Sequence, residues 1–290
     1  MRPFFIVNPV AGSGTVKDKF AAVKAHLENA GVGFGCVFTE REHQSAELAE
    51  QAYAEGERLI VAVGGDGTVN EVASALYDKK DAVMGIMPFG TGNDFAKAIN
   101  MPCEPAAAAE TLMAGKTRLI DIGLANGVPF INVGGVGFDV DVVINTEKYK
   151  ARFNGMLPYL LGIMKTLFHI KKIPVTVTAD GKAESLTMLL CAAANGTHFG
   201  GGMNVAPEAD PADGKFDVCL VKATNLFRLL AMLPGFTKGK HLKSKIVKYF
   251  RASELTIDCE RLPLQLDGEL GQFAPVTFKI LPSALRMITP

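Results

Sequence analysis

Apolar and polar positions alternate in two different ways along the chain, and the change falls near residue 116. In the first 120 residues, short continuous apolar runs are separated by segments in which apolar residues recur every three or four positions. The first pattern predicts buried strands and the second predicts amphipathic helices. The predicted strands cover residues 4–7, 35–38, 59–63 and 83–87, and the predicted helices cover 17–30, 46–54, 69–77 and 94–99. This alternation predicts an α/β domain with a parallel sheet.

From residue 116 onward, short strands are separated by Gly, Asn, Asp and Pro, which is typical of a mostly antiparallel β-domain. The predicted strands are 118–124, 129–133, 175–178, 186–193, 216–221, 254–258 and 276–280. Two apolar helical segments, 159–168 and 226–233, interrupt them, and the first is either buried or in contact with an apolar ligand. We expect two domains, residues 1–120 and 121–290, with roughly the last ten residues packing back on the first domain.

Charge and hydropathy narrow the range of partners. The chain carries 30 Lys and Arg against 30 Asp and Glu, and no base-reading motif is present, so a nucleic-acid partner is not expected. One concentrated basic run, 238–251, is either a site for anionic lipid headgroups or a solvated hairpin. No apolar run approaches the ~20 residues of a membrane-spanning helix, and the stretch 4–7 is too short for a signal-peptide core. We expect a cytoplasmic protein without a transmembrane segment.

Three loops rich in glycine and small polar residues follow strands of the first domain, at residues 8–14, 64–70 and 90–94. The carboxyl ends of parallel strands gather at one edge of the sheet, where ligands bind. Glycine allows backbone N–H groups to approach phosphate oxygens, and the next helix adds a positive dipole. No loop is a Walker A or a complete GxGxxG sequence, so the pattern predicts another kind of phosphate site. The alternative for 64–67 is a tight turn in which Asp66 caps the next helix, predicted at 69–77.

Two of these loops carry a family resemblance. Gly64-Gly65-Asp66-Gly67-Thr68 with Asn70-Glu71, followed by Pro88-Phe89-Gly90-Thr91-Gly92-Asn93-Asp94, resembles the diacylglycerol kinase catalytic domain, especially that of bacterial soluble lipid kinases. GGDG is shared with NAD kinases and phosphofructokinases, whereas GTGND after a strand is more specific. The resemblance extends from Asn8-Pro9 and Gly12 to Asp267-Gly268-Glu269. It implies a doubly wound first domain like that of NAD kinases and phosphofructokinases, a β-sandwich second domain, and a catalytic cleft between them.

The resemblance also implies phosphoryl transfer that depends on ATP and Mg²⁺. Asp66 and Asp94 would organise the Mg·ATP site, because carboxylates and phosphate oxygens together hold this cation. Further nucleotide contacts are implied for Asn8, Gly12, Thr39, Gly64, Gly65, Gly67, Thr68, Asn70, Thr91 and Asn93. Helix capping is the alternative role of the aspartates and asparagines.

A base is expected at the acceptor, because an alcohol has a very high pKa and its proton leaves during the transfer. The resemblance assigns this base to Glu269, while Asp267 would orient it or contact the metal. An ordinary surface turn is the alternative interpretation of this segment.

The acidic loop 210–215 resembles the loop that binds a structural Mg²⁺ in bacterial relatives. Asp213 would supply its side chain, and Asp210 and Lys215 would supply carbonyl oxygens, which suit a hard cation. Asp121 would tie to this loop. The alternative is an ordinary Asp-Gly hairpin turn.

Taken with the family resemblance, these residues predict a lipid kinase of phospholipid metabolism that transfers the γ-phosphoryl of ATP to a hydroxyl of diacylglycerol or a related lipid. The lipid would be met at the membrane surface, with the enzyme peripheral at the inner face, and the family suggests a homodimer. Two alternatives stay open: a kinase of a soluble substrate, like the NAD kinases, and a nucleotide-binding regulator without turnover.

Overall fold

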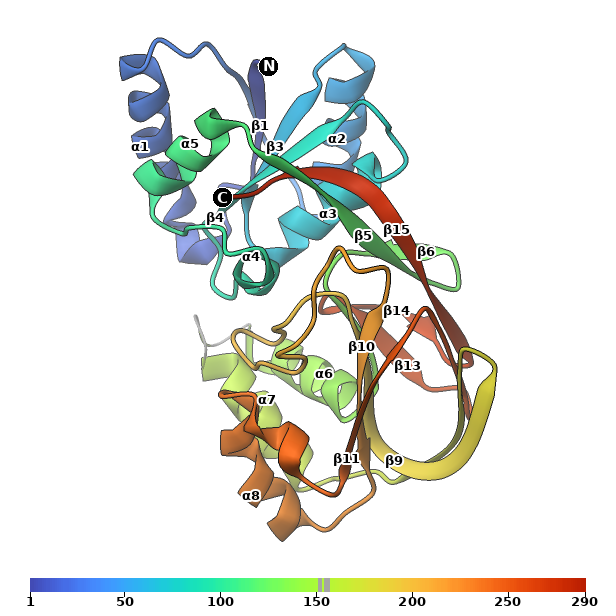
Figure 1. The fold of residues 1–290 in the computed structure, drawn as a ribbon. Helices are drawn as coiled ribbons and strands as arrows, with labels where there is room; N and C mark the ends of the chain where they lie inside the picture. The colour runs from blue at the N-terminus through green and yellow to red at the C-terminus, as the bar shows by residue number, and fades with distance from the viewer. Residues whose placement is uncertain (151–152, 154–156) are drawn as a thin grey trace.

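The first part of the chain is a parallel sheet covered by helices on both faces. A computed structural model describes residues 1–290 except 151–152 and 154–156 (Figure 1). The parallel strands are β1 (Pro3–Val7), β2 (Gly35–Phe38), β3 (Leu59–Gly64) and β4 (Val83–Pro88), in the spatial order β4-β3-β1-β2. The helices are α1 (Val16–Asn29), α2 (Ser45–Ala54), α3 (Asp66–Leu76), α4 (Asp94–Ala98) and α5 (Pro105–Ala114). The predicted α/β architecture is confirmed.

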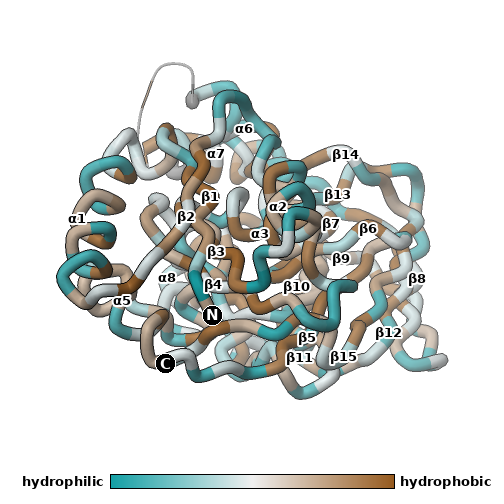
Figure 2. The backbone as a smooth tube through the Cα atoms, turned by 90° about the horizontal axis from the view of Figure 1, so that it is seen from above, coloured by the Kyte–Doolittle hydropathy of each residue, from teal (hydrophilic) through white to brown (hydrophobic). Residues whose placement is uncertain are grey.

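Alternate residues of these strands serve two separate cores. Phe5, Val61 and Val63 pack against α1 and α5, whereas Ile60 and Ala62 pack against α2 and α3. Because both faces are covered, β3 and β4 are buried along their whole length, which explains their uninterrupted apolar sequence. Figure 2 shows this contrast, with hydrophobic strands at the centre and more hydrophilic helices around them.

The second part is mostly antiparallel. Its strands are β5 (Thr117–Ala125), β6 (Val128–Phe130), β7 (Val133–Gly137), β8 (Ile173–Ala179), β9 (Lys182–Ala194), β10 (Phe216–Lys222), β11 (Val247–Ala252), β12 (Glu254–Asp258), β13 (Pro263–Leu266), β14 (Glu269–Phe273) and β15 (Val276–Ile288). They enclose a core that contains three phenylalanines in ring contact, Phe130, Phe216 and Phe278. Helices α6 (Phe138–Lys150), α7 (Leu157–Leu167) and α8 (Leu226–Phe236) and the short η2 (Lys240–Lys243) complete this part.

The long strand β15 connects the two parts of the molecule. It pairs with β12 and β5, and at its end Arg286 and Met287 pair in parallel with Val83 and Met84 of β4. The strand therefore continues the parallel sheet of the first part with the last residues of the chain, as the red ribbon in Figure 1 shows. None of the described helices is long and apolar enough to cross a membrane.

Two sequence-based expectations for the second part are wrong. The strand predicted at 129–133 is divided into β6 and β7, because the backbone N–H groups of Ile131, Asn132 and Val133 all donate to the carboxylate of Asp267. The helix α6 was not expected, because its opening sequence Phe-Asp-Val-Asp-Val alternates with the period of a strand. Helix α5 of the first part and strands β11 and β14 of the second were also not predicted.

Candidate active site

A polar cavity of about 290 Å³ lies where the two parts of the molecule meet. The first part contributes residues from the loops after β3 and β4, among them Asp66, Thr91 and Asp94. The second part contributes Asp267 and its neighbour Gly268. Asp66, Thr91 and Asp94, predicted from the first part of the sequence, thus line the same cavity as Asp267, predicted from the last part.

Glycines allow the three loops of the first part to touch one another. A Cβ atom added to Gly90 would lie 2.3 Å from the Cα atom of Gly65, so only glycine permits this contact between the second and third loops. A Cβ atom on Gly12 would lie 2.2 Å from the carbonyl oxygen of Phe89, and the φ of Gly12 is +58°. The loops therefore form one continuous backbone surface at the carboxyl edge of the sheet, where phosphate groups bind in such folds.

Asp66 and Asp94 form a close pair of carboxylates on this surface. Asp66 Oδ1 accepts hydrogen bonds from the backbone N–H groups of Asp94 (2.6 Å) and Phe95 (3.2 Å), so it caps α4 and not α3, the next helix, which the alternative interpretation had named. Asp94 pairs with Lys97 (2.8 Å) and accepts from the N–H of Gly201 (2.6 Å) in the second part. Burial, and then the charge of Asp94, raise the pKa of Asp66.

The charge of this pair fits a divalent cation. Lys97 pairs with Asp94 alone, so the charge of Asp66 has no salt-bridge partner among the described residues. Asp66 lines the cavity, and only its Oδ1 takes part in the hydrogen bonds given above. Mg²⁺ typically takes one or two protein carboxylates together with phosphate oxygens, which is the donor set that this wall would share with a nucleotide. The carboxylates of Asp66 and Asp94 are therefore suited to hold Mg²⁺ together with the phosphates of ATP.

The remaining nucleotide residues predicted from sequence lie around the same loops. The side-chain amide of Asn8 donates to the hydroxyl of Thr68 (3.1 Å), which ties the first loop to α3. The side-chain oxygens of Asn70 and Asn93 are buried without a hydrogen-bond partner among the described residues. Thr39 lies at the end of β2, where its N–H donates to Val7 (2.9 Å). Gly64 ends β3, and Gly67 lies in the first turn of α3.

The DGE turn between β13 and β14 brings Asp267 and Gly268 into the cavity lining, whereas Glu269 lies outside that lining. Asp267 Oδ1 accepts from the N–H groups of Asn132 (3.0 Å) and Val133 (2.7 Å), and Oδ2 accepts from Ile131 (2.8 Å). Glu269 Oε1 lies 3.9 Å from the position that a Cβ atom on Gly67 would occupy. The exposed Glu269 therefore faces the start of α3, while Asp267 is fixed by backbone contacts.

Asp139 is a buried carboxylate of the cavity that the sequence did not single out. Its Oδ2 accepts from the side-chain amide of Gln265 (3.1 Å), and its Oδ1 is buried without a partner in the described structure. Burial raises the pKa of Asp139 to about 7, against the lowering effect of Gln265. The Gln265 oxygen in turn accepts from the N–H of Gly268 (2.8 Å), which links Asp139 to the DGE turn.

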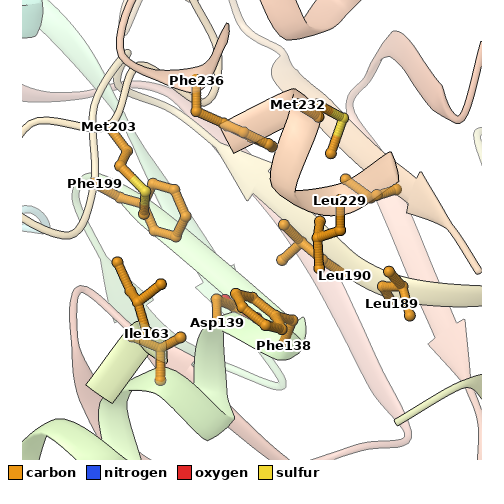
Figure 3. Close-up of a pocket in the computed structure, with 12 residues that line it drawn as sticks. Phe138, Asp139, Ile163, Leu189, Leu190, Phe199, Met203, Leu229, Met232 and Phe236 are labelled. Carbon is orange, nitrogen blue, oxygen red and sulfur yellow. The ribbon is translucent and has the colours of Figure 1, made fainter. Parts of the chain in front are cut away.

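An apolar cavity of about 40 Å³ adjoins the polar one (Figure 3). Leu229, Met232 and Phe236 of α8 point into it and face side chains from α6, α7 and β9. Phe199 and Asp139 line both cavities, so the charged wall and the apolar wall meet at these two residues. The apolar segments singled out in the sequence, 159–168 and 226–233, both contribute to it.

The acidic loop 210–215 lies apart from the cavity lining. Asp210 pairs with Arg118 (2.7 Å), and Asp213 accepts from the N–H of Lys215 (3.0 Å) and lies 3.5 Å from Arg251. Asp121 accepts from the N–H of Gly214, so the predicted tie between it and the loop exists. Arginines already balance the carboxylates, and no cluster of three metal-ligating side chains is found among the described residues. The Mg²⁺ at this loop stays a prediction.

Comparisons with known proteins agree with these features. Residues 2–125 match a family model described as the diacylglycerol kinase catalytic domain, and residues 133–289 match one described as the YegS C-terminal NAD kinase beta sandwich-like domain. The diacylglycerol kinase of Bacillus subtilis (strain 168) is 31% identical over 292 residues, covering 100% of this chain and 96% of the relative. The diacylglycerol kinase of Mycobacterium tuberculosis (strain ATCC 25618 / H37Rv) is 29% identical, covering 98% and 94%.

Solved structures share the fold. A crystal structure from Bacillus anthracis str. Sterne matches with a TM-score of 0.84 and 25% identity, covering 100% of this chain and 97% of the other. The crystal structure of a diacylglycerol kinase from the same strain matches with a TM-score of 0.77 and 22% identity, with the same coverage. The predicted combination of an α/β part with a β-sandwich part is confirmed.

Proposed function

The chain belongs to the diacylglycerol kinase catalytic-domain family, and from this membership we propose that its cleft transfers the γ-phosphoryl of ATP to the hydroxyl of diacylglycerol or a related lipid. The observation that carries the proposal is the junction of two cavities. A polar cavity lined by Asp66, Asp94 and Asp267 meets an apolar cavity at Asp139 and Phe199. An acceptor with a polar hydroxyl end and an apolar chain matches a polar cavity that adjoins an apolar one.

The loops of the first part would bind the nucleotide. Their backbone N–H groups and the start of α3 favour negative charge, so they orient the phosphates toward the cavity. Bound Mg²⁺ would neutralise charge on the phosphate oxygens, and Asp66 and Asp94 are the residues suited to hold it. Lys97, paired with Asp94, keeps one positive charge at this wall.

Glu269 is the base of the proposed reaction. Its carboxylate takes the proton of the acceptor hydroxyl as that oxygen bonds to the γ-phosphorus, and the bond from this phosphorus to the bridging oxygen of ADP breaks. Its place opposite the start of α3 supports this role. Asp267 would act as a positioning residue, because its three backbone hydrogen bonds fix the turn that carries Glu269.

The apolar cavity between α6, α7, α8 and β9 would receive only the first part of the acyl chain, because its volume of about 40 Å³ is too small for a whole chain. Its described lining is apolar except for Asp139, which burial excludes from bulk water. Each Å² of hydrocarbon surface that leaves water on binding contributes about 25 cal/mol to the binding free energy. This burial is the main source of affinity for an apolar acceptor. Peripheral association with the inner membrane face and a homodimer stay proposals; sedimentation velocity of the purified chain tests the second.

The purified protein incubated with radiolabelled ATP, Mg²⁺ and a panel of micellar lipids plus NAD tests the function. We expect label in diacylglycerol or a related lipid alcohol. Label that appears only in NAD would refute the lipid acceptor, and no transfer to any acceptor would favour a nucleotide-binding regulator. Chelation of the metal with EDTA is expected to abolish transfer, and addition of Mg²⁺ is expected to restore it.

A further inference from the structure

Helix α8 is apolar on two faces, although only one of them is covered by the protein. Leu229, Met232 and Phe236 point into the apolar cavity (Figure 3). On the other side, Phe227 is 81% exposed and Leu230 is 41% exposed. These two side chains are three residues apart and so lie on the same side of the helix. The outward side of α8 therefore presents apolar groups to the solvent.

A strongly basic segment surrounds this helix. Residues 218–253 contain eight Lys and Arg and no Asp or Glu, so the remaining 254 residues carry 22 Lys and Arg against 30 Asp and Glu. Lys248 and Arg251 pair with acidic residues outside the segment, so its unpaired positive charge among the described residues lies mainly on and around α8 and η2. Such an uneven distribution gives a local field that the net charge conceals.

Four of these cations surround an open basin of about 630 Å³ beside α8. Arg228 comes from α8, and Lys240, Lys243 and Lys245 come from η2 and the segment after it. Within the part of the chain that the structure describes, none of the four forms a salt bridge. The basin therefore offers uncompensated positive charge next to exposed Phe227.

We propose that α8 and η2 form a docking surface for a bilayer of anionic phospholipids. Phe227 and Leu230 enter the boundary between headgroups and acyl chains, and the four cations of the basin contact headgroup phosphates. The charges of the two surfaces are complementary, and a surface that pairs apolar with basic residues is typical of helices that lie in the membrane interface. Nucleic acid would match the charge but not the exposed apolar side chains.

Docking through α8 also explains how the acceptor reaches the enzyme. The same helix that meets the bilayer with Phe227 lines the apolar cavity with Leu229 and Met232, so the width of one helix separates the membrane from the proposed acyl-chain site. This part of the inference rests on the proposed lipid kinase function. The docking surface itself does not, because binding to vesicles is measured without turnover.

The first test measures co-sedimentation of the whole protein with vesicles of phosphatidylcholine alone or with phosphatidylglycerol added. We expect binding only to the anionic vesicles, weakened by salt. Each cation near such a surface contributes about five-fold in affinity, so Lys240→Glu/Lys243→Glu/Lys245→Glu is expected to weaken binding at least about 100-fold. Unchanged binding of this variant would overturn the proposal, as would retention on duplex DNA without vesicle binding.

A charge-matched control separates position from net charge. Lys80, Lys116 and Lys182 are exposed and lie outside residues 218–253. Lys80→Glu/Lys116→Glu/Lys182→Glu changes the net charge by the same amount and is expected to bind vesicles at least ten times more tightly than the first triple variant, since long-range charges are screened. Equal loss in both variants would overturn the proposal, because general charge would then explain binding.

A second test reports insertion in a folded protein. The chain contains no tryptophan, so Phe227→Trp places a single tryptophan on the outward side of α8. Its emission is expected to move to shorter wavelength with anionic vesicles, because tryptophan favours the membrane interface. Met113→Trp on α5, 38% exposed, is the control and is expected to stay unchanged. An unshifted emission of the Phe227→Trp protein on vesicles that sediment it would refute insertion.

Activity distinguishes a failure of docking from a failure of the proposed function. With a short-chain, water-soluble diacylglycerol, the first triple lysine variant is expected to retain kcat/KM, whereas its rate on vesicle-bound diacylglycerol falls with its vesicle affinity. Equal rates of variant and wild type on vesicles would contradict docking through this surface. A wild-type protein that binds vesicles but phosphorylates neither substrate would refute the lipid kinase function and leave the docking surface standing.

Discussion

Replacing Asp139 with asparagine is expected to stabilise the protein, and to do so only above pH 4. The carboxylate is 4% exposed, has one hydrogen bond, from Gln265, and leaves Oδ1 buried without a partner in the described structure. Asparagine has nearly the same shape and keeps an oxygen for Gln265, but it cannot ionise. The substitution therefore removes a buried charge and little packing.

The magnitude follows from the pKa of Asp139, which burial raises from 3.8 to about 7. In the unfolded chain the group loses its proton near pH 4, whereas in the folded protein it keeps the proton until about pH 7. Asp139 therefore destabilises the folded protein more and more as the pH rises from about 4 to about 7. Above about pH 7 this loss of folding free energy stays constant. Three pKa units correspond to at most about 4 kcal/mol.

Thermal unfolding of both proteins between pH 4 and pH 8 is the assay. Unfolding a chain of 290 residues changes the entropy by about 0.6 kcal/mol/K, so 4 kcal/mol raises Tm by at most about 7 °C. We expect equal Tm values at pH 4 and a higher Tm for Asp139→Asn at pH 8. Asp141→Asn is the control, because Asp141 pairs with Lys171 at the surface (2.7 Å) and its loss costs at most about 1 kcal/mol.

The result that would refute this reasoning is a lower Tm of Asp139→Asn at pH 8, or an advantage that does not depend on pH. Either would mean that the ionised carboxylate has a partner in solution, such as water or a cation from the cleft. The unpartnered oxygen would then be a ligand position, and the acidity of the group would lie near its ordinary value.

Three further outcomes are expected. Glu269→Gln should lower kcat by about 10²-fold or more with the KM for ATP unchanged, as a base of the transfer requires; normal turnover would remove it from this role. Gly90→Ala should cost about 1–3 kcal/mol of stability and raise the KM for ATP, because its Cβ atom would lie 2.3 Å from the Cα atom of Gly65. Gly33→Ala is the control and should change neither stability nor KM, because no atom lies within 4 Å of its Cβ position. Asp213→Asn should lower the Mg²⁺ content found by elemental analysis; an unchanged content contradicts a metal at that loop.

The parallel strands were predictable because their signal is local. The runs at 59–63 and 83–87 are apolar at every position, since the helices on both faces leave no side of β3 or β4 in water. The glycine loops after them were predictable for a related reason. Close backbone contacts, such as that of Gly90 with Gly65, require residues without a side chain, and this requirement appears in the sequence.

Features that depend on distant residues were not predictable in this way. The strand predicted at 129–133 is interrupted by a carboxylate that lies 134–136 residues further along the chain, in Asp267. Asp139 becomes a buried group through Gln265, 126 residues away. Gly135 leaves room for this group in the folded protein, because a Cβ atom there would lie 1.8 Å from the Asp139 carboxylate. Without the fold, nothing in the sequence connects these residues.

The pairing of β15 with β4 has a consequence for how the protein is made. A ribosome completes β1 to β4 long before it reaches residues 276–288, so β4 must wait as an open sheet edge while the whole second part is synthesised. Open edges recruit strands of other chains. The nascent first part is therefore exposed to aggregation until β15 is made. Binding of a chaperone, or of ATP to its loops, would protect it during this interval.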